Sequence, residues 1–177
     1  MTKLSKRFLV WSNESSSSSP FTIINGEKLE MRVTFFSFHY QRDIWRANVV
    51  RNSGVVIGEA AAGFRDASLW EEAKKKGDAV IKKMIDDGLL GTTVTVVLIG
   101  NQTANRKYIN YEIEQSLKRG NGLFGLRIHN IKDQNGNLDL AGPTPTILSN
   151  NGYPIYTWTN NADFAKWVEN AYQAANN

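Results

Sequence analysis

The carboxylate with the best position for chemistry in this sequence is Glu112. It follows the strongly apolar run Val94–Ile99, in a segment whose apolar residues recur at helical spacing. At 100° per residue, Glu112 lies roughly 90° from the middle of that apolar face. A side chain at this boundary can reach into a cleft, whereas the plainer interpretation is an exposed helix glutamate. Glu114 should point to solvent and serves as its internal control.

Other side chains that could contact a ligand have equally plain alternatives. His39 follows an apolar, β-rich run, and it either contacts a ligand or hydrogen bonds to the backbone. Trp70 either covers a pocket or packs under its own helix. The three lysines Lys74–Lys76 are most simply explained as a solvated helix face.

Several function classes are excluded by what the sequence lacks. It has no cysteine and only two histidines, which leaves neither a disulfide framework nor a cysteine-based zinc site. The glycine-rich fingerprints of Rossmann domains and P-loop NTPases are absent. So are the G-x-S-x-G motif of serine hydrolases and the H-E-x-x-H motif of zinc proteases.

The charge distribution indicates either a site for a small anionic ligand or simply a mixed, solvated surface. The net charge is +4, and residues 105–132 carry six Lys or Arg against two Glu, whereas residues 133–177 carry one Lys against four acids. This basic middle could bind a dinucleotide, but no nucleic-acid-binding motif accompanies it, so we expect no nucleic-acid partner. No apolar run approaches a secretory signal or a membrane span, and we expect a cytoplasmic protein without a membrane partner.

The chain divides into a short extension and one domain. Residues 1–30 contain a serine run and are expected to be a flexible extension or to form a small hairpin around Asn25-Gly26. The domain covers residues 31–177. Strands are expected at residues 32–38, within 60–65, and at 94–99, 123–128 and 153–158. Helices are expected at residues 43–50, from a capping box at Ser68 to about 87, at 106–118 and at 163–175.

This alternation of strands and helices predicts an α/β fold, a three-layer sandwich around a mainly parallel sheet. In such folds, ligands bind beyond the carboxyl ends of the strands. The loops that follow Phe38, Arg65, Ile99 and Ile128 are therefore the places to look for a site.

Many short motifs in this order and spacing resemble the TIR-like domain family of bacterial Thoeris anti-phage defence. They include residues 33–40, 46–52, 66–75, 94–100, 102–103, 105–106, 111–113, 120–121, 129–130, 132–133, 136–137 and 142–143. The resemblance covers about residues 31–175 and implies a flavodoxin-like fold. It also implies cleavage of NAD at the nicotinamide–ribose bond, with NAD as substrate and no separate cofactor. The product would be a cyclic ADP-ribose-type signal that diffuses to a partner effector protein.

The resemblance gives roles to particular residues. Glu112 corresponds to the catalytic glutamate of the family, and Phe38, His39 and Tyr40 correspond to substrate contacts after the first strand. The loop after the second strand adds Asp66, Ser68, Leu69 and Trp70 as substrate-binding residues. The resemblance is also compatible with self-association of TIR-like domains. The alternative is a non-catalytic TIR-like module that binds a nucleotide or another protein.

Overall fold

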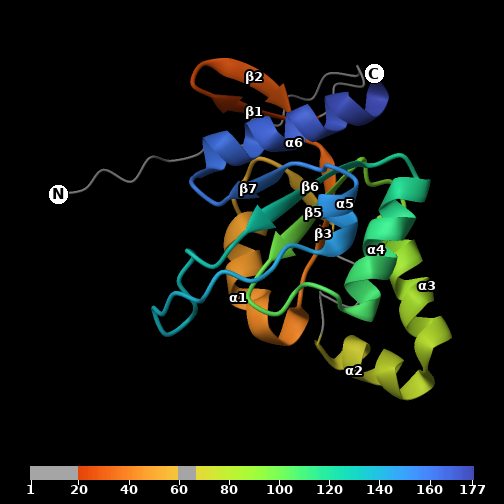
Figure 1. Ribbon diagram of the computed structural model, residues 1–177. Helices are drawn as coiled ribbons and strands as arrows, with labels where there is room; N and C mark the ends of the chain where they lie inside the picture. Colours follow the sequence, from red (N-terminus) through yellow and green to blue (C-terminus); the bar gives the residue numbers. More distant parts are fainter. Residues whose placement is uncertain (1–19, 60–66) are drawn as a thin grey trace.

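The computed structural model describes residues 20–59 and 67–177, and the side chains of all of these except 58, 59 and 67–70 (Figure 1). Its centre is a five-stranded sheet in the order β4-β3-β5-β6-β7, and each neighbouring pair is parallel. The strands are β3 (Val33–Ser37), β4 (Ile57–Glu59), β5 (Val94–Ile99), β6 (Gly122–Arg127) and β7 (Ile155–Thr157). The prediction of a mainly parallel α/β sheet is confirmed, and this strand order is the flavodoxin-like one.

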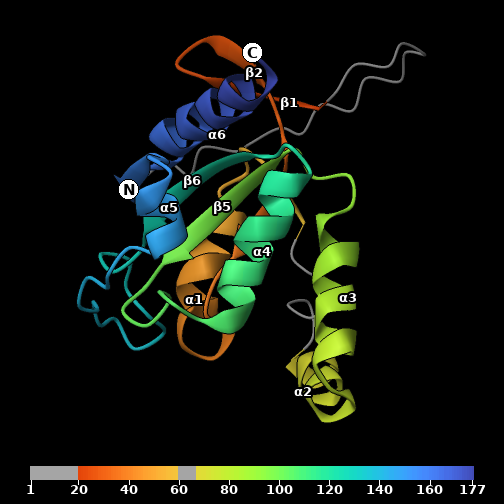
Figure 2. The ribbon, with the colours of Figure 1, turned by 45° about the vertical axis from the view of Figure 1, so that its right-hand side comes forward.

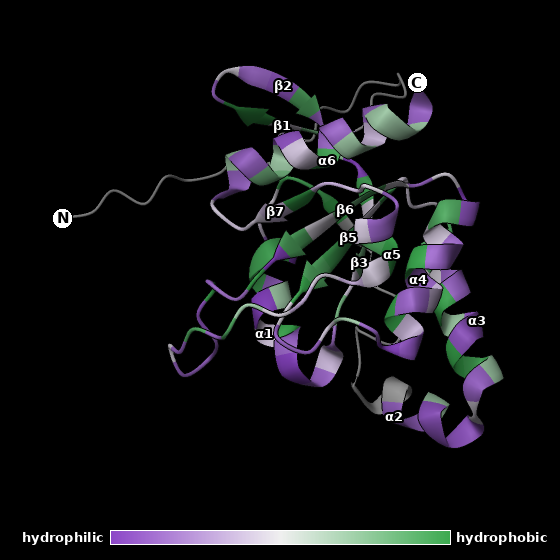
Figure 3. Cartoon of the chain, in the orientation of Figure 1, coloured by the Kyte–Doolittle hydropathy of each residue, from purple (hydrophilic) through white to green (hydrophobic). Residues whose placement is uncertain are grey.

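Helices cover both faces of the sheet (Figures 1 and 2). They are α1 (Tyr40–Arg51), α2 (Ala67–Lys76), α3 (Asp78–Leu89), α4 (Lys107–Lys118), α5 (Thr146–Asn150) and α6 (Asn161–Asn176). Alternate residues of β5 enter two core clusters, one shared with α1 and α6 and the other with α4 and α5. All six residues of β5 are buried, and in Figure 3 the hydrophobic colour gathers on the central strands of the sheet while the helices alternate between the two colours.

One predicted helix is two helices. The sequence pattern from Ser68 to about residue 87 predicts a single continuous helix, but α2 ends at Lys76 and α3 begins at Asp78. Gly77 separates them with a φ of 104°, a conformation that a glycine adopts without steric cost and that a helix cannot contain. The prediction of one helix here is therefore wrong.

Residues 21–30 form a hairpin. Strands β1 (Phe21–Ile24) and β2 (Glu27–Glu30) pair antiparallel around Asn25 and Gly26, whose φ values of 52° and 83° are typical of a tight hairpin turn. The hairpin alternative for this segment is confirmed. Residues 1–19 lie outside the described residues, so the division into a flexible extension and a domain stays a prediction.

Element boundaries differ from the predicted ones mainly at the N-terminal ends. Helix α1 begins at Tyr40, three residues before its predicted start, and the short helix α5 was not predicted. Residues 60–65, where a second strand was expected, lie outside the described residues, and β4 lies just before them. Asn160 caps α6, because its side-chain oxygen accepts a hydrogen bond from the backbone N–H of Asp163 at 3.0 Å.

Two arginines hold the long loop after β6 against the domain. Arg46 of α1 donates to the carbonyl oxygens of Ile131 at 2.9 Å and Asn137 at 3.2 Å. Arg127 at the end of β6 donates to the carbonyl of Gly142 at 2.7 Å and to Thr144 Oγ1 at 2.8 Å. These hydrogen bonds attach the loop to α1 and to the carboxyl end of β6. No helix among the described residues combines the length and apolar character needed to cross a membrane.

The close approach of α6 to β6 gives a prediction for stability. A Cβ at Gly122 would lie 2.3 Å from the carbonyl oxygen of Ala171, a backbone atom that only a shift of α6 could move away. We expect Gly122→Ala to lower the free energy of unfolding by about 3 kcal/mol. The melting temperature should fall by on the order of 10 °C.

Gly125→Ala, in the same strand, is the matched control. The three atoms nearest to its Cβ would be terminal methyl groups of isoleucine and leucine side chains, which can rotate away. Thermal unfolding followed by circular dichroism measures both variants. Equal losses of stability in the two would contradict the proposed fit between α6 and β6.

Candidate active site

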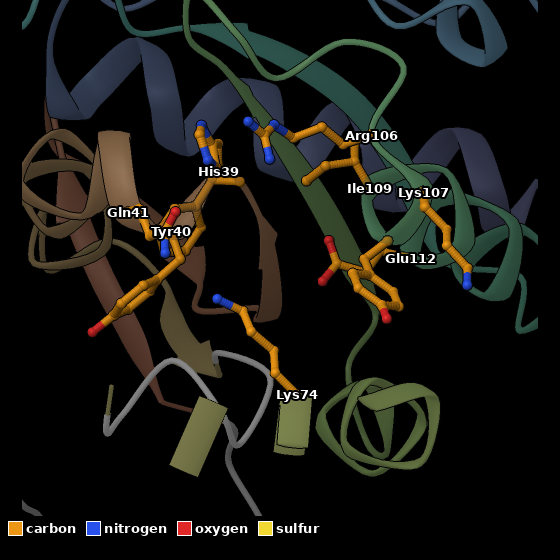
Figure 4. A pocket seen from close by; sticks show the side chains of 10 residues that line it. His39, Tyr40, Gln41, Lys74, Arg106, Lys107, Ile109 and Glu112 are labelled. Atoms are coloured by element: carbon orange, nitrogen blue, oxygen red, sulfur yellow. The ribbon is translucent and has the colours of Figure 1, made fainter. Parts of the chain in front are cut away.

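A pocket of about 300 Å³ opens beside the carboxyl ends of β3 and β5 (Figure 4). In the sheet order, β3 lies between β4 and β5, so the connections that leave β3 and β5 diverge to opposite faces. Such a point of divergence is where parallel α/β sheets bind ligands. The pocket is lined by Phe38, His39, Tyr40, Gln41, Lys74, Arg106, Lys107, Tyr108, Ile109 and Glu112.

Glu112 lies in the second turn of α4, and its side chain is only 1% exposed. Figure 4 shows its carboxylate directed into the space between α4 and the loop after β3. The plainer interpretation of an exposed helix glutamate is therefore wrong. Glu114 is exposed, as expected of the control position.

Among the described residues, the Glu112 carboxyl group accepts a hydrogen bond from Ser37, and its pKa is strongly shifted. The hydroxyl of Ser37, the last residue of β3, donates to Oε2 at 2.5 Å. Burial raises the pKa of Glu112 to about 8 from an ordinary value of 4.5, and the Ser37 hydrogen bond opposes that rise. A carboxyl group with a pKa near neutrality, at the wall of a pocket, is typical of functional sites.

Buried polar side chains fix the backbone behind Glu112. Ser116 Oγ donates to the Glu112 carbonyl oxygen at 2.7 Å and accepts from Thr95 Oγ1 at 2.8 Å. Asn121 Nδ2 in turn donates to Thr95 Oγ1 at 3.2 Å. Because these groups are buried and hydrogen bonded, they tie α4 to β5 and limit the movement of the Glu112 backbone.

Three residues after β3 form the wall that faces α4. Phe38 is buried, and its ring lies 6.4 Å from that of Tyr40. The pKa of His39 is lowered, first by burial and then by the positive charges of Arg106, Arg42 and Lys74. These effects favour the neutral form of His39, and its Nδ1 atom is buried without a hydrogen-bond partner among the described residues. All three residues that were predicted to contact the substrate, Phe38, His39 and Tyr40, line the pocket.

Three cationic side chains line the same pocket. Lys107 Nζ forms an ion pair with Asp78 at 2.6 Å, and Lys74 Nζ forms one with Glu71 at 2.8 Å. The Nε atom of Arg106 donates to the carbonyl of Gln102 at 2.8 Å. Lys74–Lys76 are exposed, as expected for a solvated face, but Lys74 also contributes to the pocket.

Asp43 lies behind the site without lining it. Its carboxyl group is fully buried against Gly100, where an added Cβ would come within 2.3 Å of Oδ2. Burial raises the pKa of Asp43 to about 6, and Arg46 Nη1 at 3.8 Å opposes this. Gly100 begins the loop that leads to α4, so the Asp43 carboxyl group packs against the start of that loop. Within the described residues, no group of three or more His, Asp or Glu side chains is placed to hold a metal ion.

The structure describes only some of the residues of the predicted site. The side chains of Ser68, Leu69 and Trp70 and the whole of Asp66 lie outside the described residues, so their roles stay predictions. The sequence interpretation also missed pocket residues, among them Arg106, Tyr108 and Ile109. Arg106 could have been found, because it ends the loop after Ile99, one of the loops at the carboxyl edge of the sheet.

The fold and the buried glutamate on the helix after the central strand define a TIR-like domain. The chain matches the family described as Thoeris protein ThsB, TIR-like domain, over residues 35–133, which is more than half of its length. It is also 45% identical over 144 residues to a Bacillus cereus (strain MSX-D12) protein named "Putative cyclic ADP-D-ribose synthase ThsB1". That similarity covers 76% of this chain and 73% of the relative. The chain belongs to the Thoeris ThsB family of TIR-like proteins.

Proposed function

We propose that this protein cleaves NAD at the nicotinamide–ribose bond and makes a cyclic ADP-ribose-type signal. The observation that carries the proposal is the buried Glu112 carboxyl group on the wall of the pocket, supported by Ser37. The name of the Bacillus cereus relative, a cyclic ADP-D-ribose synthase, supports the same reaction class. Phe38, His39 and Tyr40 serve as substrate contacts.

One carboxylate suffices for this reaction. The nicotinamide ring of NAD carries a positive charge, and when the C1′–N bond breaks the electron pair stays on the ring nitrogen. Nicotinamide therefore leaves as a neutral molecule, and no general acid has to protonate it, in contrast to ordinary glycosides. The ribose is left with oxocarbenium character, which the Glu112 carboxylate stabilises by its charge.

The high pKa of Glu112 fits a cationic substrate. A pKa of about 8 keeps most of the Glu112 carboxyl groups protonated at pH 7. A bound nicotinamide ring places a positive charge near the carboxylate, which lowers its pKa and releases the proton. The ionised form of Glu112 is thus favoured when NAD occupies the site.

Cyclisation requires that water be kept from the ribosyl cation. A nucleophilic atom of the adenosine part of the same molecule attacks C1′ and then loses its proton, so that no water is added. The apolar surfaces of Phe38, Tyr40 and Ile109 line the pocket and reduce its access to water. The aromatic rings of Phe38 and Tyr40 also offer flat faces for the nicotinamide.

The proposed product defines the partners. A diffusible cyclic nucleotide acts on a separate effector protein, without a stable complex between the two proteins. We place the reaction in the cytoplasm, where NAD is available, and include self-association of the TIR-like domain as part of the proposal.

Incubation of the purified protein with NAD tests the proposal. Chromatography should detect nicotinamide, and mass spectrometry should detect a product one water lighter than ADP-ribose. The same assay in extracts of phage-infected cells supplies any trigger that the purified protein lacks. Binding of NAD with no nicotinamide release in either preparation would instead support a non-catalytic nucleotide-binding module.

A further inference from the structure

We infer that Arg106 binds the diphosphate of the dinucleotide at the mouth of the pocket. The inference rests on the proposed function, because it assigns a second part of the same substrate to a second part of the same site. A diphosphate is the main anionic group of NAD and of ADP-ribose. A cation that binds it must face the pocket and must not already be paired with a carboxylate.

Arg106 meets this condition better than the neighbouring lysines. Lys107 pairs with Asp78 and Lys74 pairs with Glu71. No carboxylate among the described residues forms an ion pair with Arg106, and its only hydrogen bond there uses Nε. Both terminal guanidinium nitrogens therefore remain available to an anion.

The side chains of Arg106 and Lys107 also point in different directions. Figure 4 shows the Arg106 guanidinium extending across the pocket toward His39, while the Lys107 ammonium points away from it. The hydrogen bond from Arg106 Nε to the Gln102 carbonyl restrains the guanidinium in this direction. A side chain that is restrained before binding loses less entropy when the anion arrives.

The spacing between Arg106 and Glu112 suits the substrate. Both residues belong to the start of α4, with Arg106 as the N-cap residue and Glu112 six residues later. Six residues of α-helix rise about 9 Å. This leaves room for a ribose whose C1′ lies at Glu112 and whose 5′ carbon leads to the phosphates at Arg106.

The main chain of α4 adds to the positive potential of this wall. The pocket is lined by Arg106 and by the first three helical residues, Lys107, Tyr108 and Ile109. The first turn of the helix carries no acidic residue, and no side chain caps it. The N–H groups of this turn therefore favour an anion at the same place as the Arg106 guanidinium.

Equilibrium binding tests the inference without any need for turnover. Isothermal titration calorimetry with ADP-ribose and with adenosine compares ligands with and without the diphosphate. The wild-type protein should bind ADP-ribose more tightly than adenosine. Arg106→Gln should weaken ADP-ribose binding about tenfold or more, the loss expected for a charge-assisted hydrogen bond, and should leave adenosine binding unchanged.

Two further variants separate a specific contact from a general effect of charge. Arg106→Lys keeps the charge but not the planar fork, so it should recover only part of the affinity for ADP-ribose. Lys118→Gln removes one positive charge from the exposed far end of α4 and should bind ADP-ribose like the wild type. An equal loss in Lys118→Gln, or wild-type affinity in Arg106→Gln, overturns the inference.

The role of Arg106 in diphosphate binding can be tested separately from the proposed cleavage of NAD. If the protein releases no nicotinamide from NAD but loses ADP-ribose affinity in Arg106→Gln alone, the diphosphate contact stands and the catalytic proposal falls. If NAD is cleaved and Arg106→Gln binds ADP-ribose normally, the catalytic proposal stands and the role of Arg106 is rejected.

Discussion

Glu112→Gln is expected to slow nicotinamide release from NAD by about 10²- to 10³-fold. The amide has the shape of the carboxyl group and can still accept the hydrogen bond from Ser37, but it carries no charge to stabilise the ribosyl cation. Because the lost interaction is strongest in the transition state, kcat should fall far more than KM changes. Initial rates of nicotinamide release over a range of NAD concentrations give both constants.

Glu114→Gln makes the same chemical change two residues further along the same helix. Glu114 is exposed and does not line the pocket, so this variant should keep the wild-type rate. Circular dichroism verifies that both variants are folded. A folded Glu112→Gln protein with full NAD turnover would rule out Glu112 as the catalytic carboxylate.

The same substitution is expected to stabilise the fold at alkaline pH. The pKa of Glu112 is about 8 in the folded protein and has an ordinary value of 4.5, which we take for the unfolded chain. The folded state therefore holds the proton more tightly, and its stability falls as the pH rises from about 4.5 to about 8. Glutamine avoids this loss, since it never ionises. At pH values above 8, Glu112→Gln should be more stable than the wild type by about 3 to 5 kcal/mol.

Thermal unfolding of both proteins at about pH 5 and about pH 8.5 measures this difference. The melting temperatures should be similar at the lower pH and should separate at the higher pH, with the variant above the wild type. Other titrating groups contribute equally to both proteins, so the comparison isolates Glu112. A constant difference across this pH range would show that the carboxyl group does not retain its proton in the fold.

The sequence predicted those parts of the fold that depend on regular patterns. The apolar run of β5 and the amphipathic pattern of α4 each have a local physical cause, and each is present in the structure. The hairpin turn at Asn25-Gly26 also follows from local backbone preference. The parallel sheet then follows from the alternation of elements.

What the sequence did not predict depends on contacts between distant segments. Helical spacing continues across Gly77, so only the backbone conformation of that glycine reveals the break between α2 and α3. The burial of Glu112 requires β3 to bring Ser37 beside α4, from 75 residues away. Similarly, Lys107 and Arg106 look alike in sequence, and only the position of Asp78 on α3 distinguishes a paired cation from an available one.

Because Arg106 and Glu112 belong to the same stretch of α4, their separation is set by main-chain hydrogen bonds rather than by the packing of side chains. Core residues between them can vary in type without moving one relative to the other. An insertion or deletion of one residue, however, would turn one side chain by about 100° and shift it by about 1.5 Å relative to the other. The residues between Arg106 and Glu112 should therefore tolerate substitutions among related proteins, whereas the length of the segment should not change.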